Sequence, residues 1–200
     1  MAARRSYHHG DLRAALVDAG LALVAEHGVD ALSVAEAARR TGVSPAAPYR
    51  HFPTRQALLV AVATRAAELL AAELRASLAA VDDPYEALAA TAAVYVRFVV
   101  RHHAGLDLIF AEQLQSPADP ALAAAGRAVL DVLLPLALDV VGGDPPAALV
   151  LLEQHVAAAH GYATLYLSGF GRQRPTDVDE IADGAAAVSR TLAAAARAGV

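Results

Sequence analysis

The chain has 200 residues, no cysteine and a formal net charge of −5 at pH 7. This length suits one ordinary domain or a small domain joined to a medium one, and the missing cysteine excludes disulfides, thiolate zinc sites and cysteine nucleophiles. Because 56% of the residues are hydrophobic and only 5% are aromatic, the composition favours helices over strands, and the predicted fold class is all-α.

The charge is distributed unevenly along the chain. Residues 1–55 hold seven arginines and five acidic residues, whereas residues 56–200 hold nine arginines and sixteen acidic residues. A mildly basic head on an acidic body predicts an anionic partner for the head. The start of the chain makes a poor signal peptide, and later apolar stretches are interrupted before the roughly 18 residues of a membrane span. We therefore expect a soluble, cytoplasmic protein with no membrane partner.

Helix start and stop signals predict about nine helices. The first runs from about residue 11 to residue 27 and stops at Gly28. A capping box, Ser33-x-x-Glu36, opens the second, which ends near residue 40. The others are expected at about 45–51, 55–80, 84–103, 105–115, 120–141, 145–168 and 178–198. Most of them follow a capping residue, which in three cases is an aspartate followed by proline at the first helical position. These caps are Ser44, Thr54, Asp83-Pro84, Asp119-Pro120, Asp144-Pro145 and Asp177.

Two short segments, 34–40 and 45–51, have the dimensions of a helix-turn-helix. In the second, Pro45 occupies the first helical position without cost, whereas Pro48 removes one intrahelical bond and loosens the first turn. Such a smooth edge can approach a DNA major groove closely, and the donors for phosphates and base edges follow it at Tyr49, Arg50 and His51. A plain corner in a helical core explains the same spacing equally well.

The segment "ALSVAEAARRTGVSPAAPYRHFPTRQALLVAVA" resembles the DNA-binding head of tetracycline-repressor (TetR) family transcription regulators. The matching features are Glu26-His27-Gly28, Ser33-Val34-x-x-Ala37-Ala38, Gly42-Val43-Ser44, Tyr49-x-His51-Phe52 and Arg55-x-x-Leu58-Leu59. The resemblance implies a DNA-binding domain over 8–68, with its helix-turn-helix at about 33–52. It also implies an effector-binding and dimerisation domain over 69–200.

The resemblance implies a homodimer whose two heads read the half-sites of a near-palindromic, double-stranded operator. In this role Arg55 stands where a lysine is usual and would bind a phosphate. Pro48 departs from the pattern, because many members have leucine there. Arg4, Arg5 and Arg13 are further phosphate candidates on charge grounds. The resemblance implies that the DNA-facing residues are Ser33, Ala35, Pro45, Ala46, Ala47, Tyr49, Arg50 and His51.

The segment "HVAAAHGYATLYLSGF" (155–170) resembles a C-terminal subgroup of the family with a Trp-x-x-x-His-Gly signature, although Val156 stands where tryptophan is expected. The opening "SYHHGDLR" accompanies the same subgroup. In the family the last two helices form a four-helix dimer interface, which implies dimerisation here through about 145–168 and 178–198. Close helix approach would use a stripe of small residues, Ala157, Gly161, Thr164 and Ser168.

An effector pocket needs polar groups in an apolar cavity, and a mostly apolar pocket would suit a mostly apolar small molecule. Structural alternatives exist, since Tyr95 and Phe98 at helical spacing also fit a core and His102 also fits a helix end. His160, beside Gly161, is better explained as a hydrogen-bonded structural histidine. The candidates for the pocket are Tyr95, Phe98, His102, Phe110, Gln113, His155 and Tyr162.

No enzyme chemistry is indicated. His155 and His160 are five residues apart, unlike the pair four apart that binds zinc on a helix. The sequence has no helical Glu-x-x-His element, nucleophile elbow or phosphate-binding loop, so we expect no catalytic residue, metal or cofactor. The predicted function is a sequence-specific transcription regulator, and the resemblance implies a repressor released by a small-molecule effector. The alternative is a helical dimerisation or scaffold protein without DNA binding.

Overall fold

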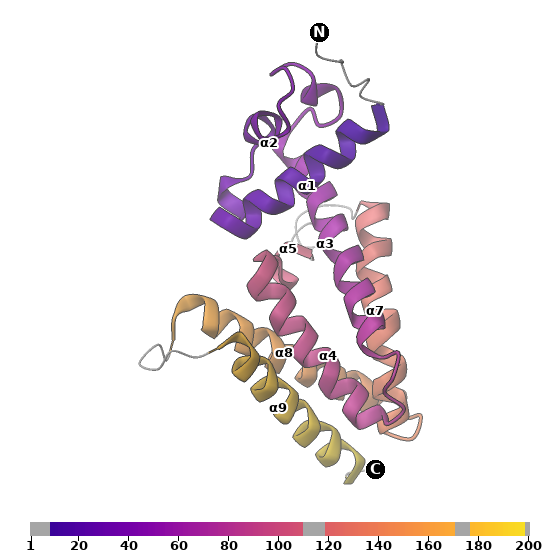
Figure 1. Cartoon of the computed structure of the whole chain (residues 1–200). Helices are drawn as coiled ribbons and strands as arrows, with labels where there is room; N and C mark the ends of the chain where they lie inside the picture. Colours follow the sequence, from indigo (N-terminus) through magenta and orange to yellow (C-terminus); the bar gives the residue numbers. More distant parts are fainter. Residues whose placement is uncertain (1–8, 110–118, 171–176, 199–200) are drawn as a thin grey trace.

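A computed structural model of the chain describes residues 9–109, 119–170 and 177–198. These residues contain no strand, so the all-α fold class is confirmed. A small helical head sits at one end of an elongated helical body (Figure 1). The seven α-helices of eight or more residues among them are α1 (His9–His27), α2 (Val34–Thr41), α3 (Arg55–Ser77), α4 (Pro84–His102), α7 (Pro120–Val140), α8 (Pro145–Ser168) and α9 (Val178–Ala198).

The expectation of about nine helices is too high for the described residues. Segment 45–51 forms no α-helix and contains only the 3₁₀ helix η2 (Pro48–Arg50). Of the segment expected at 105–115, the described part holds the single turn α5 (Leu106–Ile109). A further 3₁₀ helix, η1 (Val29–Ala31), links α1 to α2.

Side-chain caps begin several helices where the sequence indicates them. The hydroxyl oxygen of Ser33 accepts a hydrogen bond from the backbone N–H of Glu36 at 3.1 Å, and Thr54 caps α3 in the same way. Asp119 accepts from two backbone N–H groups at 2.9 and 3.2 Å. Each bond satisfies a donor that has no partner within its helix. Asp144 makes no side-chain cap bond, so proline alone marks the start of α8.

In the head, α1 packs against both α2 and the N-terminal part of α3. A Cβ atom on Gly20 of α1 would lie 2.7 Å from Cγ2 of Val62, so glycine allows α1 to approach α3 closely. On the surface, Arg40 of α2 donates two hydrogen bonds to the carboxylate of Glu26 in α1, at 2.6 and 2.8 Å. The largest fully buried side chains of the head are Leu16, Leu23, Leu32, Phe52 and Leu58.

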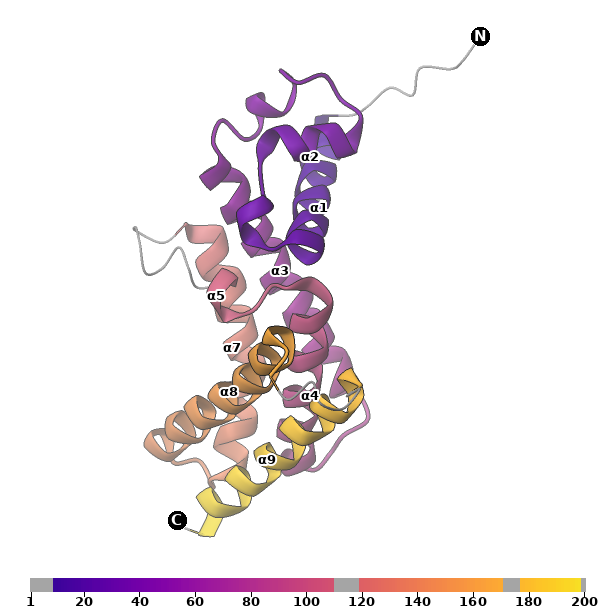
Figure 2. The same ribbon diagram turned by 90° about the vertical axis from the view of Figure 1, so that its left-hand side faces the viewer.

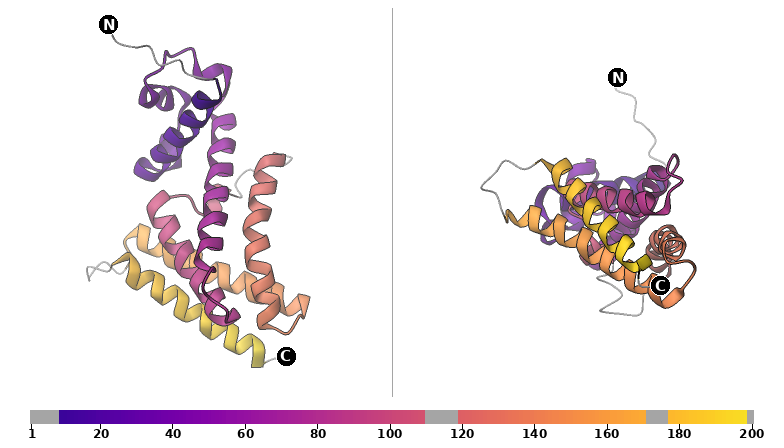
Figure 3. Two further views of the ribbon diagram at one scale, coloured as in Figure 1. Left: turned by 45° about the vertical axis from the view of Figure 1, so that its right-hand side comes forward. Right: turned by 90° about the horizontal axis from the view of Figure 1, so that it is seen from below.

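One long helix, α3, leaves the head and runs into the body with α7 alongside it (Figure 3). Helices α8 and α9 pack on α4, and the C-terminal end of α9 lies far from the head (Figure 2). Ion pairs tie α4 to α9: Arg97 binds Asp179 at 2.6 Å and lies 3.7 Å from Asp183, and Arg190 binds Glu86 at 2.8 Å. The body therefore connects to the head through a continuous helical backbone.

By length and composition, one described helix, α7, could cross a membrane, which the sequence reading did not anticipate. Only 39% of its most apolar 18-residue stretch is buried within the chain, but the helix packs against α3, α4 and α8. It also carries the exposed charged residues Arg127 and Asp131. A core helix of a soluble protein can have the same length and composition, so this feature alone is weak evidence for a membrane span.

Candidate functional site

The exposed end of the head is built by the segment around η2. Pro45 and Pro48 have no N–H, so the regular hydrogen-bond ladder of an α-helix cannot form across this segment. Two linked turns replace it: Ala47 donates to the Ser44 carbonyl at 3.1 Å, and His51 donates to the Pro48 carbonyl at 2.9 Å. The sequence prediction allowed for one lost bond, whereas the second proline changes the form of the whole segment.

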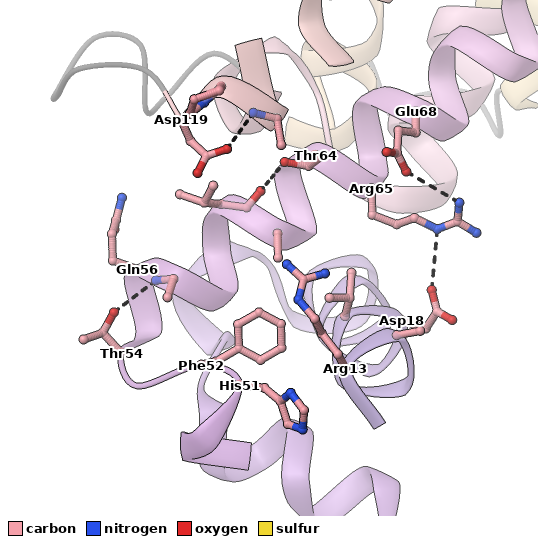
Figure 4. A pocket seen from close by; sticks show the side chains of 17 residues that line it. Arg13, Asp18, His51, Phe52, Thr54, Gln56, Thr64, Arg65, Glu68 and Asp119 are labelled. Atoms are coloured by element: carbon pink, nitrogen blue, oxygen red, sulfur yellow. Dashed lines mark hydrogen bonds and ion pairs between the residues drawn. The ribbon is translucent and has the colours of Figure 1, made fainter. Parts of the chain in front are cut away.

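Two buried residues fix this segment on the head. Pro48 is buried, and Phe52 is 2% exposed against the core. The guanidinium of Arg13 in α1 lies over the Phe52 ring, 5.2 Å from its centroid (Figure 4), which is a favourable cation–π distance. With these anchors inside, the neighbouring residues face outward: Pro45, Ala46, Tyr49 and Arg50 are exposed, while Ala47 and His51 are half-buried.

Most arginines of the described part of the head already have partners. Arg39 binds Glu36 and Arg40 binds Glu26, each at 2.6 Å. These hydrogen bonds lower the pKa of both glutamates, so the pairs stay charged and largely cancel. Arg50 differs, because within the described head it is the arginine that makes no hydrogen bond, ion pair or ring contact. Its charge is therefore available to a partner molecule.

The other DNA-facing candidates lie on either side of this segment. Ser33 uses its hydroxyl to cap α2, and Ala35, two residues later, is exposed. Arg55, the first residue of α3, donates hydrogen bonds to the backbone carbonyls of Leu32 at 2.9 Å and Val29 at 2.7 Å. Its role at a phosphate stays a prediction. Arg4 and Arg5 lie outside the described residues.

An open groove of about 850 Å³ lies between the head and the start of α7 (Figure 4). Arg65 of α3 is 3.6 Å from Asp18 of α1 and 3.9 Å from Glu68, so charges of both signs line the groove. His51 and Asp119 form other parts of its wall. This groove borders the junction of head and body.

A second hollow, which we call the body cavity, lies among α3, α4, α7 and α8 and has a volume of about 110 Å³. It brings together two of the predicted pocket residues, Tyr95 and His155, and adds Thr91, which the sequence reading missed. The sequence does hold a signal for Thr91, because this polar residue falls on the same face of α4 as the apolar Leu88 and as Tyr95. The cavity is lined by Leu70, Leu74, Thr91, Tyr95, Val129, Leu130, Leu133, His155, Val156 and Ala159.

His155 is the centre of a buried polar chain. Its Nε2 lies 3.2 Å from Oγ1 of Thr91, and its Nδ1 lies 2.8 Å from Oγ of Ser189 in α9. The Thr91 hydroxyl in turn donates to the carbonyl of Leu88 at 2.6 Å. Burial disfavours the charged ring and lowers the pKa of His155 to about 4, so the imidazole is neutral at pH 7. Ser189 was also missed, because its partner lies 34 residues away.

The remaining pocket candidates lie elsewhere. Phe98 is fully buried in the core, and its ring centroid is 4.6 Å from that of His102. Tyr162 packs against α9, where a Cβ on Gly184 would lie 2.8 Å from its ring. His160 accepts or donates a hydrogen bond of 2.8 Å with the Tyr95 hydroxyl. The last two candidates, Phe110 and Gln113, lie outside the described residues.

The stripe of small residues lies on an outer face of α8. Ala157, Thr164 and Ser168 are exposed, and a Cβ on Gly161 would meet nothing within 4 Å. Helical spacing places two large apolar side chains on the same face, and both are about half exposed: Val150 at 54% and Leu165 at 50%. Within the single chain this apolar face of α8 is open.

The part of the chain that the structure describes contains no group of three or more His, Asp or Glu placed to hold a metal ion. Its ionisable clusters are the paired charges of the surface and the neutral His155 chain. The features that can engage a partner therefore include the exposed end of the head, the body cavity and the open apolar face of α8.

Comparisons with known families cover both parts of the chain. The family model "Bacterial regulatory proteins, tetR family" matches residues 16–62. A second model, "Tetracyclin repressor-like, C-terminal domain", matches residues 88–189, which is just over half of the chain. These matches do not identify the subgroup with the Trp-x-x-x-His-Gly signature. Among curated proteins, none matches the sequence.

Solved structures share the fold over nearly the whole chain. A protein of unknown function from Rhodococcus sp. RHA1 is 32% identical, with a TM-score of 0.77 over 94% of this chain and 98% of that one. A tetR-family transcriptional regulator from Streptomyces coelicolor is 20% identical, with a TM-score of 0.71 over 97% and 85%. A TetR variant from Acinetobacter baumannii AYE, solved with minocycline, is 19% identical, with a TM-score of 0.61 over 95% and 96%.

Proposed function

Because the chain belongs to the tetR family of bacterial regulatory proteins, we propose that it is a cytoplasmic, sequence-specific DNA-binding regulator of transcription. The observation that carries this proposal is the exposed pair Tyr49 and Arg50 at the end of the head, where Arg50 has no partner among the described residues. An exposed arginine on an anchored segment can bind the O6 and N7 atoms of guanine or a phosphate.

The shape of the segment supports contact with a groove of DNA. Pro45, Ala46 and Ala47 carry little side-chain bulk, so the backbone can approach base edges before Tyr49 and Arg50 engage. Because Arg39 and Arg40 are neutralised by glutamates, the described head offers few free cations. We therefore expect modest non-specific affinity and a contribution from shape to recognition.

A homodimer would place two such heads on one operator. The open apolar face of α8, with Val150, Gly161 and Leu165, is suited to a second copy because small residues permit close helix approach. A two-fold dimer reads a near-palindromic site, since each head meets the same half-site sequence. The Trp-x-x-x-His-Gly subgroup would share this arrangement, and membership in it stays a prediction.

The body cavity is the candidate effector site. Helix α3 lines it with Leu70 and Leu74 and begins at Arg55 in the head, so one helix contacts both parts. A small molecule that favours one position of α3 would change the separation of the two heads and release the operator, which makes the protein a repressor. The similar fold solved with minocycline supports small-molecule binding by a body of this kind.

The deciding experiment is selection of duplexes from a random-sequence pool by the purified full-length protein. We expect enrichment of one near-palindromic sequence. Binding to it should weaken with salt, with a slope of about −0.9 per phosphate contact. The Tyr49→Ala, Arg50→Ala double variant should lose the selectivity while keeping its helicity and oligomeric state. A pool that shows no enrichment, with equal binding to all duplexes, would support the scaffold alternative.

A further inference from the structure

We propose that the body cavity binds a small, uncharged, largely apolar molecule that carries one hydroxyl group, such as a simple phenol or alcohol. The inference rests on the proposed function, in which this cavity holds the effector, and it adds the chemical class of that effector. Three properties of the cavity carry it: its size, the absence of charged residues from the described part of its lining, and the hydrogen-bonding capacity left at Thr91.

The size of the cavity limits the ligand to about one ring. Its volume of about 110 Å³ is smaller than that of a typical drug pocket, roughly 300–1,000 Å³. An engineered apolar cavity of about 150 Å³ in another protein is known to accept benzene. A molecule of several fused rings would therefore require the walls to move apart. Leu130 of α7 lines the cavity and is 40% exposed, so the cavity lies close to the surface at this residue.

The lining excludes charged ligands. Its described residues include no arginine, aspartate or glutamate, and the histidine among them, His155, is held neutral by burial. A carboxylate or an ammonium group placed there would lose its hydration without gaining a counter-charge, which is strongly unfavourable. Of the ten described lining residues, seven are Leu, Val or Ala, so the cavity favours apolar atoms.

The polar chain determines which hydrogen-bonding group the ligand should carry. Thr91 has a single hydroxyl hydrogen and donates it to the Leu88 carbonyl at 2.6 Å. It must therefore accept from His155, which places the ring hydrogen on Nε2. Nδ1 then has no hydrogen, and it accepts from the Ser189 hydroxyl at 2.8 Å.

This assignment leaves a vacant acceptor at Thr91. A hydroxyl oxygen has two lone pairs, and His155 uses one of those on Thr91. Both ring nitrogens of His155 are engaged, and the Tyr95 hydroxyl is bonded to His160 at 2.8 Å. The capacity that remains at the His155–Thr91 pair is therefore for a donor, which a ligand hydroxyl supplies and a carbonyl group does not.

The test is a binding titration of the full-length protein, without DNA, with three probes of similar size: phenol, benzaldehyde and benzoate. Phenol donates a hydrogen bond, benzaldehyde only accepts, and benzoate is charged. We expect phenol to bind about tenfold more tightly than benzaldehyde. For benzoate we expect no saturable binding to the protein. Benzaldehyde or benzoate binding as tightly as phenol would overturn the assignment, and so would a failure of phenol to bind.

Two variants locate the bound molecule. Thr91→Val removes the acceptor at nearly constant volume and should abolish the preference for phenol, whereas Thr91→Ser should retain it. Ala159→Leu fills the cavity and should block phenol. If phenol binding is unchanged in Ala159→Leu, the molecule binds outside the body cavity and the proposal is wrong. If Thr91→Val does not fold, the comparison of probes in the unmodified protein still decides.

The proposal and the regulator function fail separately. Phenol selectivity is read without DNA, and operator selection is read without ligand. If phenol binds as expected but no duplex is selected, the ligand class stands and the regulator function is wrong. If an operator is selected but phenol does not bind, the ligand class alone is wrong.

Discussion

Arg55 donates a hydrogen bond of 2.9 Å from its Nε to the backbone carbonyl of Leu32, which ties the first turn of α3 to the connection that precedes α2. A second bond, of 2.7 Å, reaches the carbonyl of Val29. The planar guanidinium can bond both carbonyls together, whereas the single ammonium of a lysine cannot reproduce that fork. The arginine at this position therefore has a structural task beside any contact with DNA.

Replacing Arg55 by lysine should separate these two tasks. We expect the free energy of unfolding to fall by about 1 kcal/mol, because the fork of two bonds is lost while the charge remains. Urea denaturation measures the change, and Arg39→Lys is the matched control, since Arg39 forms an exposed ion pair on the same head. Unchanged stability in Arg55→Lys would show that the two backbone bonds contribute little.

Arg50→Ala should lower operator affinity by about tenfold to a hundredfold, which corresponds to 1–3 kcal/mol for one arginine at a base edge. If the guanidinium binds a phosphate instead, the loss should be uniform across sequences and the salt slope should fall by about one. Arg127→Ala removes the same charge from the exposed surface of α7 and serves as the control. Equal losses in both variants would mean that only net charge matters.

Gly161→Leu should weaken the proposed homodimer without harming the single chain. A Cβ at this position meets nothing within 4 Å, and leucine also has a higher helix propensity than glycine. A bulky side chain would nevertheless hold a partner helix away from α8. Sedimentation equilibrium should show a dissociation constant raised at least about tenfold, the equivalent of 1.4 kcal/mol. Ala124→Leu, at an exposed position of α7, is the control.

His155 should make stability depend on pH below neutrality. Its pKa falls from 6.5 to about 4 in the folded chain, so the unfolded state takes up the proton first as the pH falls. Stability is then complete above pH 6.5, decreases between pH 6.5 and 4, and stops changing from this cause below pH 4. The loss reaches about 2 kcal/mol at pH 5 and about 3 kcal/mol at pH 4.

The His155→Gln variant supplies the reference for this measurement. Glutamine cannot titrate, so the difference between the two proteins isolates the histidine from the carboxylates and from His102, whose pKa burial also lowers. Urea denaturation at pH 7, 5 and 4 gives the difference. An identical pH dependence in both proteins would mean that His155 is not buried as a neutral ring.

Features that depend on neighbouring residues were predictable from the sequence. The caps at Ser33, Thr54 and Asp119 were expected because a capping side chain bonds to backbone only two or three residues away. The starts of α7 and α8 at Pro120 and Pro145 were also predictable, since an Asp-Pro pair marks each of them. The family resemblance in the head has the same origin, because its residues recur at fixed local spacings.

Features that depend on tertiary packing were not predictable. Thr91, His155 and Ser189 lie on three different helices, and the separation between Thr91 and His155 is 64 residues along the chain. No local pattern shows which of several histidines will meet a threonine inside a cavity. The form of η2 also differed from expectation, because Pro48 acts together with Pro45 rather than removing one bond alone.

The two prolines at the end of the head also affect the thermodynamics of association. Proline holds φ near −65° in the free chain as well as in a complex. Backbone fixed in this way loses less conformational entropy when a partner binds, and each residue ordered on binding would otherwise cost roughly 1–2 kcal/mol. A segment with few contact side chains can therefore bind firmly, because its rigidity offsets the contacts that it lacks.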